Sequence, residues 1–200
     1  MYNSGLFLGT SLLSVAVYWS LPEHVSNWDR KKILEDGPWN KWKTNILKGP
    51  VWDRDNPFIN YVTHPYAGAF YYMSARGSGY NQWQSFTYTA LMSTLFWEYG
   101  LEAFAEVPSY QDLMLTPLVG AVLGEHFYAI KGRIIRNDRK WHNSRIFGQA
   151  ALILIDPMNE FLDAVGYKTR HKKLDFHSMV VPLTLKGNFT GIQIAMNATF

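Results

Sequence analysis

Three glutamates recur at four-residue intervals within a largely apolar segment: Glu98, Glu102 and Glu106, between Leu91 and Val107. In a helix this spacing places the three side chains along one narrow stripe. Carboxylates so close together repel one another, and burial makes their charged forms more costly still. The stripe must therefore face water, a cation, a basic side chain or a proton shared between carboxylates.

Other groups that could act together with this stripe lie before and after it in the chain. His64 precedes a segment that ends at Arg76, about one helix length later, and Glu125 stands next to His126. The candidate catalytic residues are His64, Arg76, Glu98, Glu102 and Glu125, and the candidate metal ligands are Glu98, Glu102, Glu106 and His126. Such a set could bind a metal, perform acid–base catalysis or form an internal salt-bridge network. The sequence leaves all three open.

We predict that five of these side chains converge in the folded protein: His64, Arg76, Glu98, Glu102 and Glu125. Isolated carboxylates in apolar helices are costly to keep ionised, and Arg76 and His64 are the nearest cationic or donor groups. We therefore expect Arg76 or His64 within hydrogen-bonding distance of at least one glutamate, at roughly 2.7–3.2 Å between heavy atoms.

Several kinds of site are excluded by the residues that the chain lacks. It contains no cysteine, which removes disulfides, zinc–thiolate sites and thiol nucleophiles. It also lacks the Gly-x-Ser-x-Gly, His-Glu-x-x-His and phosphate-loop motifs. No motif identifies a cofactor, and whether the protein is an enzyme stays open at this level.

The central part of the chain resembles a known family over roughly residues 45–133. The resemblance is carried by Trp52-Asp53, Asn56-Pro57-Phe58, His64-Pro65-Tyr66, Gly68, Tyr71, Ala75-Arg76, Ser93, Trp97-Glu98-Tyr99, Glu102, Pro108-Ser109, Asp112-Leu113, Gly120 and Gly124-Glu125. This pattern is similar to the bacterial envelope family known as domain of unknown function 3943. The resemblance implies a location in the cell envelope, with larger relatives in the outer membrane, and it implies no activity.

The composition points to a surface that is partly not water-facing. The chain is 48% hydrophobic and 18% charged, and it has 8 Trp and 12 Tyr, whereas an ordinary soluble domain is roughly 25% charged. Trp and Tyr concentrate where an apolar phase meets water. Short basic clusters could meet lipid head groups or lipopolysaccharide phosphates. Nucleic acid is not an expected partner, because no nucleic-acid module is present.

The periodicity predicts one domain over residues 1–200 that is mainly α. We expect an apolar helix at about 5–21, a Trp-rich connector or interfacial belt over 27–60, helices at 65–76, 84–107, 110–135 and 144–155, and a C-terminal β-hairpin at about 178–200. Ser109 should begin the third core helix, and the Gly120 and Gly124 pair should let another helix approach it closely. The predicted fold is a compact bundle of hydrophobic helices with this hairpin. The alternative is part of an outer-membrane β-barrel with internal helices.

From these features we expect a membrane-associated protein of the bacterial cell envelope, at the outer membrane or its periplasmic face. It would bind membrane lipid, lipopolysaccharide, a protein partner or a second copy of itself, without catalysis. The alternative is a membrane-lipid hydrolase that uses His64 and the Glu98, Glu102 and Glu106 stripe. A third hypothesis is an inner-membrane protein anchored by residues 5–21. Residues 1–22 lack the basic start and cleavage site of a signal peptide, so we favour an export signal that was removed.

Overall fold

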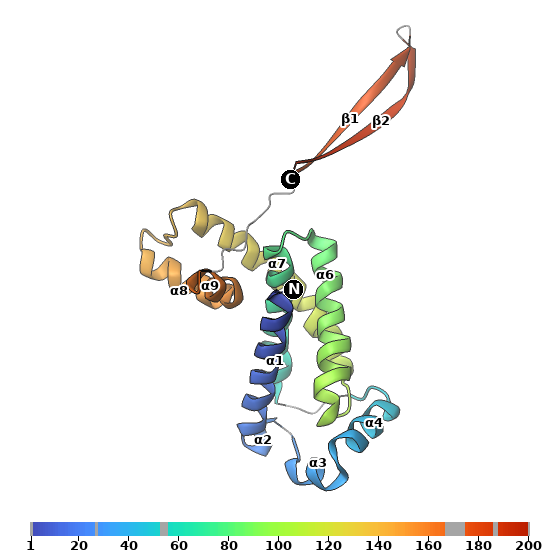
Figure 1. Ribbon diagram of the computed structural model, residues 1–200, viewed down its shortest axis with the longest axis vertical. Coiled ribbons are helices and arrows are strands. Elements are labelled where there is room, and N and C mark those ends of the chain that lie inside the picture. The colour runs from blue at the N-terminus through green and yellow to red at the C-terminus, as the bar shows by residue number, and fades with distance from the viewer. Residues whose placement is uncertain (1, 27, 53–55, 167–174, 186–187, 200) are drawn as a thin grey trace.

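The computed structural model shows a mainly α-helical chain (Figure 1). It describes residues 2–26, 28–52, 56–166, 175–185 and 188–199, and side chains for residues 9–26, 28–52 and 56–166. The helices are α1 (Tyr2–Ser20), α2 (Glu23–Ser26), α3 (Arg30–Asp36), α4 (Pro38–Lys48), η1 (Ile59–Thr63), α5 (His64–Gly77), α6 (Gln82–Leu91), η2 (Met92–Leu101), η3 (Glu102–Phe104), α7 (Tyr110–Arg136), α8 (Arg145–Ile155) and α9 (Pro157–Ala164). The strands are β1 (Asp175–Leu185) and β2 (Asn188–Thr199).

A column of long helices forms the centre of the helical part. Helices α5 and α7 run in the same direction, because His64 at the start of α5 lies next to Asp112 at the start of α7, and Arg76 near the end of α5 meets Glu125. Helix α6 with its continuation η2 runs the opposite way, since Gln82 contacts Glu125. Helix α1 stands beside this unit in Figure 1. We call α1, α5, α6 with η2, and α7 the helical column.

Glycines allow α5 and α7 to pack with their backbones almost touching. A Cβ atom added to Gly68 would lie 1.9 Å from the backbone oxygen of Thr116, and one added to Gly120 would lie 2.5 Å from the Cα of Gly68. At Gly124 the added atom would lie 2.7 Å from the Cβ of Tyr72. The prediction that Gly120 and Gly124 admit a close helix is therefore confirmed, and Gly68 supplies the facing surface.

Two predicted segments differ from the observed elements. The expected connector over 27–60 contains two helices, α3 and α4, which meet at Gly37 with φ of +78°. The helix expected over 84–107 begins as α6 but continues as the wider π-helix η2 and ends in the 3₁₀ turn η3. Its hydrogen-bond pattern changes along the segment, which the apolar pattern alone does not reveal.

The helix starts, in contrast, follow local rules. The Ser109 hydroxyl accepts a hydrogen bond from the Asp112 N–H at 3.0 Å, which confirms the predicted start of α7. Ser144 caps α8 in the same way, and Asp156 separates the end of α8 from Pro157, which begins α9. These caps explain why the predicted boundaries at 110 and 144 lie within one residue of the observed ones.

The two strands are antiparallel, and their register pairs Asp175 with Thr199 at one end and Leu185 with Asn188 at the other. We also expected a turn at residues 186–188. Its first two residues lie outside the described residues, and so does Phe200. The hydrophobic core of the helical part is divided into small groups, among them Tyr71 with Met158 and Leu162. Among the side chains that the structure describes, several small apolar groups, and not one large core, surround the polar side chains described next.

Candidate functional site

The glutamate stripe lies at the end of the helical column where α5 and α7 begin. Here four side chains from four different elements are buried: His64 of α5, Glu98 of η2, Glu102 of η3 and Asp112 of α7, each less than 8% exposed. Together with the nearby Glu106 they form what we call the acidic cluster. The structure thus brings together His64, Glu98 and Glu102 of the predicted site.

Ser109 fixes two members of the acidic cluster through its position before α7. Its backbone N–H donates a short hydrogen bond to Glu98, and its hydroxyl lies 2.6 Å from a carboxylate oxygen of Asp112. Backbone donors at the start of a helix stabilise negative charge. Glu98 and Asp112 are therefore held by the helix start that Ser109 creates.

Asp112 was not among the predicted site residues, although it lies next to His64. The Nδ1 atom of His64 lies 3.6 Å from Asp112 Oδ1 and 3.4 Å from the Thr116 hydroxyl. A signal for this role is present in the sequence: positions 112, 116, 120 and 124 recur every four residues and share one face of α7. Since that face carries the glycines that meet α5, Asp112 had to lie near the start of α5.

Glu102 of the acidic cluster retains a proton that a free carboxyl group would release. Burial raises the pKa of Glu102 well above its usual range, and the charges of Glu98, Glu106 and Asp112 raise it further. A hydrogen bond with Glu98 also favours the protonated form of Glu102. Burial and the charge of Glu102 likewise raise the pKa of Tyr71. A proton between Glu98 and Glu102 is thus one means by which the stripe is tolerated inside the protein.

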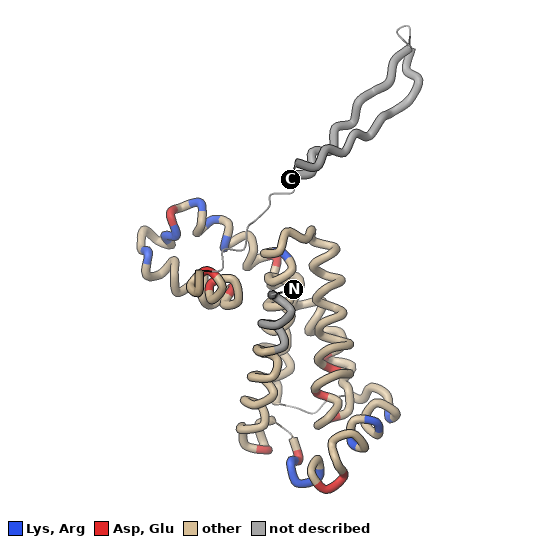
Figure 2. The backbone as a smooth tube through the Cα atoms, in the orientation of Figure 1, with Lys and Arg blue, Asp and Glu red and all other residues tan. Residues whose placement is uncertain are grey.

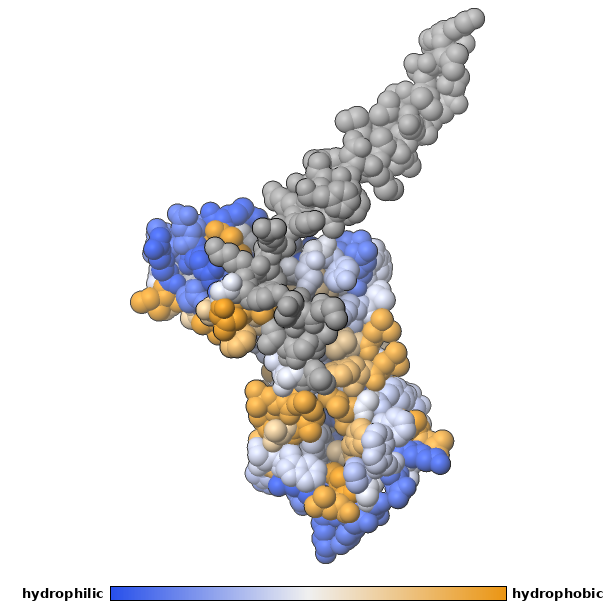
Figure 3. Space-filling model, viewed as in Figure 1, coloured by the Kyte–Doolittle hydropathy of each residue, from blue (hydrophilic) through white to orange (hydrophobic). Residues whose placement is uncertain are grey.

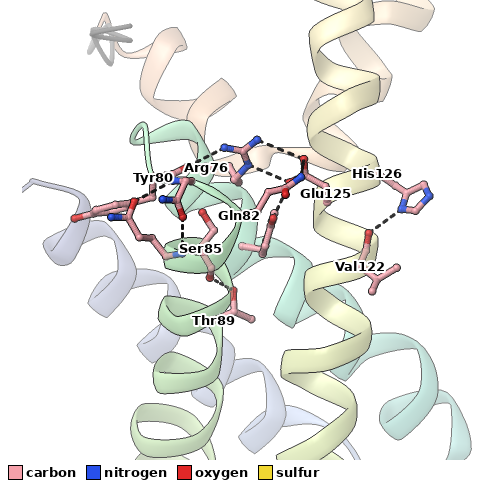
Figure 4. A network of polar contacts seen from close by, with 11 residues as sticks. Arg76, Tyr80, Gln82, Ser85, Thr89, Val122, Glu125 and His126 are labelled. Carbon is pink, nitrogen blue, oxygen red and sulfur yellow. Dashed lines mark hydrogen bonds and ion pairs between the residues drawn. The ribbon is translucent and has the colours of Figure 1, made fainter. Parts of the chain in front are cut away.

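The other predicted pair, Arg76 and Glu125, lies at the opposite end of the column (Figure 4). Arg76 Nε donates to Glu125 Oε2 at 3.0 Å. The Tyr72 hydroxyl and the Gln82 amide donate to the same carboxylate at 2.6 and 3.0 Å. The Arg76 guanidinium also lies 4.0 Å from the centre of the Tyr128 ring. We call the two charged residues of this group the Arg76–Glu125 pair.

These contacts favour the charged form of Glu125. Partial burial by itself would raise the Glu125 pKa, but the hydrogen bonds from Gln82, Tyr72 and Arg76, with the positive charge of Arg76, outweigh burial and lower it. The same carboxylate contact and burial raise the pKa of Tyr72. The Arg76–Glu125 pair is therefore an ion pair, whereas the acidic cluster depends on proton sharing and backbone donors.

The predicted convergence of all five side chains is wrong, because they form two groups that lie apart along the helices. His64 and Arg76 are separated by twelve residues of one helix, or about 18 Å along its axis. The expected contact between a cationic group and a glutamate is present, at Arg76 and Glu125. The physical reason for the division is that α5 and α7 are parallel, so that residues near their starts and residues near their ends form separate groups.

Among the candidate metal ligands, His126 lies far from the three glutamates. His126 is exposed, and its Nδ1 lies 2.8 Å from the backbone oxygen of Val122 on its own helix. Figure 4 shows Glu125 and His126 pointing in opposite directions from α7. His126 is fourteen residues beyond Asp112, about 21 Å along the helix, so it cannot join Glu98, Glu102 and Glu106. In the part of the chain that the structure describes, no three carboxylate or imidazole groups are arranged to hold a metal ion.

A pocket of about 420 Å³ adjoins the acidic cluster. His64 and Thr116 line it on the side of the acidic cluster, and its other walls come from α1, α5, η2 and the start of α9. Most of its lining side chains are apolar or aromatic, as in small-molecule sites. The buried His64–Asp112 pair therefore faces a space that could hold a ligand.

The middle of the helical column exposes apolar side chains, while charged residues gather toward its two ends (Figures 2 and 3). On α7 this surface consists of Tyr110, Met114, Leu118 and Val122, which recur every four residues and are each at least half exposed. Leu91 and Leu95 on α6 and η2, and Leu12, Leu13 and Val17 on α1, are also about half exposed or more. We call this surface the apolar band.

Among the described residues, α7 is the helix that is long and apolar enough to cross a membrane by length and composition. The core helix of a soluble protein can pass the same test. Such a helix is mostly buried, whereas only 22% of the apolar window of α7 is buried. Exposure, more than length, distinguishes α7 from an ordinary core helix.

Comparison with known proteins gives one family. The family model described as "Domain of unknown function (DUF3943)" matches residues 49–158, more than half of the chain. No curated protein and no solved structure matches the chain. The matched region runs from the end of α4 to the start of α9 and includes the acidic cluster and the Arg76–Glu125 pair.

Proposed function

We propose that this chain, which belongs to the family described as "Domain of unknown function (DUF3943)", is a membrane-associated protein of the bacterial cell envelope that binds lipid without catalysis. The observation that carries the proposal is the exposed apolar band. A soluble monomer rarely exposes so many large apolar side chains on its long helices unless they contact a membrane or a partner.

The length of the band fits contact with one leaflet of a bilayer. The exposed apolar face of α7 extends from Tyr110 to Val122, which is about 18 Å along the helix. The hydrocarbon core of a bilayer is about 30 Å thick. The band therefore supports a protein that rests in the lipid surface, with its charged ends in the head-group region or in water.

Basic and aromatic residues beside the band favour a lipid surface over a purely protein partner. Arg133, Arg136 and Arg145 are exposed at the α7–α8 end, close in sequence to the exposed Trp141. At the other end the exposed Trp39 lies in α4, close to the basic residues of α3. Trp at the boundary of the apolar region and Lys or Arg beyond it are typical of proteins that contact phospholipid or lipopolysaccharide head groups.

The proposal is tested by flotation of the purified chain with vesicles of phosphatidylethanolamine and phosphatidylglycerol. We expect the parent to float with the vesicles and a Met114→Lys, Val122→Lys double variant to remain at the bottom, because two charges would enter the hydrocarbon region. A matched Leu34→Lys, Leu47→Lys variant, exposed but outside the band, should float. If the parent stays at the bottom, the band binds a protein partner or a second copy, and the lipid proposal is wrong.

The location in the envelope has its own test. In fractionated cells we expect the chain in the outer-membrane fraction after a high-salt wash, because apolar contacts survive salt. We include the C-terminal hairpin in this proposal as a membrane-facing element. Deleting Phe200 should then lower the membrane-bound yield without changing helical content. Recovery of the parent in the soluble fraction would contradict the proposed location.

The second candidate function is hydrolysis of a membrane lipid. It is favoured by one observation: His64 is buried beside Asp112 and lines the pocket. An imidazole oriented by a carboxylate can act as a general base, and here it would assist attack of water on a lipid ester to give a fatty acid and an alcohol. Release of fatty acid from vesicles by the parent, absent in a His64→Gln variant, would favour this reaction over simple binding.

A further inference from the structure

We infer that the pocket beside His64 binds a single acyl chain, with the methyl end inside and the head group outside. This inference rests on the proposed function, because the membrane that the apolar band contacts is the source of the ligand. The pocket has a volume of about 420 Å³, within the range of about 300–1,000 Å³ typical of small-molecule sites.

The walls of the pocket are suited to a hydrocarbon. Leu13 of α1, Ala67, Phe70 and Tyr71 of α5, and Trp97 of η2 line it. If water filled this volume it would hold roughly 14 molecules, since each occupies about 30 Å³. Water in such a space finds few partners, so an apolar occupant is favoured.

Three hydroxyl groups of the lining are already bonded to the backbone. Ser14 donates a hydrogen bond to the backbone oxygen of Thr10 at 3.0 Å, and Thr63 donates to that of Ile59 at 2.6 Å. The Tyr66 hydroxyl donates to the backbone oxygen of Leu154 at 2.6 Å. Because these donors are committed to backbone oxygens, they offer little to a polar ligand.

The space is held open by aromatic contacts at one end of α1. The Tyr18 ring lies 5.6 Å from that of Trp28 and 6.3 Å from that of Trp97, measured between centroids. Trp19 also contacts Trp28, at 6.5 Å. These contacts fix the C-terminal end of α1, while Thr10, Ser11, Leu13 and Ser14 of the same helix line the pocket.

Charge decides the orientation of the ligand. Asp112 lies directly behind His64, and Glu98 and Glu102 are in the same buried cluster. An anionic head group placed there would be repelled by the negative charge that the cluster keeps, above all that of Asp112. Leu13, in contrast, lines the pocket and is 65% exposed, and it belongs to the apolar band. An acyl chain can therefore enter from the membrane-facing side beside Leu13 while its head group stays in the lipid surface.

The test is titration of the purified chain with a dansyl-labelled fatty acid in the absence of vesicles. We expect saturable fluorescence enhancement with the parent. An Ala67→Trp variant, whose indole occupies the pocket, should bind at least about tenfold more weakly, because each excluded methylene group loses contact free energy. Ala150→Trp, at an exposed position of α8, is the matched control and should bind like the parent.

Competition distinguishes the two sources of an acyl chain. Displacement of the probe by oleate but not by lysophosphatidylethanolamine would identify a free fatty acid, and displacement by both would identify the chain of a membrane lipid. A photoreactive fatty acid should label residues 10–18 or 63–71 of the parent, a measurement that needs no variant. Absence of saturable binding, equal binding by Ala67→Trp and Ala150→Trp, or labelling elsewhere would overturn the inference.

The outcome is separable from that of the proposed function. Ala67→Trp should still float with vesicles, because the apolar band is unchanged. The Met114→Lys, Val122→Lys variant should still bind the probe, because neither residue lines the pocket. If vesicle binding fails while probe binding persists, the pocket inference stands and the membrane proposal falls.

Discussion

The two ends of the helical column stabilise their carboxylates by different means. At one end Glu98, Glu102 and Asp112 are almost completely buried, and their stabilising groups are a shared proton, the start of α7 and His64. At the other end Glu125 is about one-third exposed and is paired with Arg76. The first arrangement depends on protons, while the second depends on a permanent positive charge.

The difference shows that similar glutamates in one small protein can have opposite responses to pH. Glu102 is protonated more readily than a free carboxyl group, and Glu125 less readily. Buried groups with a raised pKa are common where proteins carry out acid–base chemistry. The Arg76–Glu125 ion pair, in contrast, keeps its carboxylate in the charged form.

The largest expected effect comes from a change that disturbs both ends together. Gly68→Ala places a methyl group against the Thr116 backbone, so α5 and α7 must separate. We expect a loss of about 3 kcal/mol or more in the free energy of unfolding. Gly9→Ala, where the added atom meets nothing within 4 Å, is the control and should be neutral or stabilising. Urea unfolding of the parent and both variants measures the change in the free energy of unfolding. Equal stability would show that the helices are not in close contact.

The next effect is confined to the acidic cluster. Glu98→Ala removes the acceptor of the Ser109 N–H, which is buried, and should cost about 1–3 kcal/mol. Glu35→Ala removes a carboxylate that is mostly exposed and should cost less than about 1 kcal/mol. Thermal melts at neutral pH compare the two. If Glu98→Ala melts like Glu35→Ala, Glu98 does not hold the start of α7.

The pH dependence of stability should separate the two ends. Because the pKa of Glu102 is raised on folding, the folded protein keeps a proton that the unfolded chain releases, and stability falls as pH rises above the usual value of 4.5. Because the pKa of Glu125 is lowered, its contribution is lost as pH falls below 4.5. Melting temperatures of Glu102→Gln should decline less than those of the parent between about pH 5 and 8.

In the same melting experiment, the effect of Glu125→Gln should have the opposite dependence on pH. This substitution should lower stability at neutral pH by about 1–2 kcal/mol, since it removes the charge that Arg76 contacts. The difference from the parent should shrink as the pH falls below 4.5. Parallel melting profiles for the parent and both variants would show that the two ends do not differ in protonation.

The smallest effect is expected at His126, which is exposed and lies within hydrogen-bonding distance of the Val122 backbone oxygen on its own helix. His126→Ala should change the free energy of unfolding by no more than about 0.5 kcal/mol. Zinc or manganese ions added to the parent or to His126→Ala should shift the two melting temperatures equally. A shift specific to the parent would restore His126 as a metal ligand.

Short-range patterns in the sequence determined much of the helical part. The Ser109 cap, the glycines at 120 and 124, and the break at Asp156-Pro157 predict the bounds and one contact surface of α7 and the end of α8. Each depends on interactions between residues a few positions apart, which the sequence states directly. The contact between a glutamate and Arg76 was also predictable, because a carboxylate in an apolar helix needs a donor.

Tertiary structure alone decided which groups meet. The sequence shows that α5 and α7 each carry polar residues near both ends, but the parallel direction of the two helices assigns His64 to Asp112 and Arg76 to Glu125. The π-helical course of η2 and the pocket between α1, α5 and η2 also depend on contacts between distant segments, including Tyr18 with Trp97. Helix direction and packing are set by the summed burial of many side chains, so no local spacing could divide the predicted site in two or place a pocket beside His64.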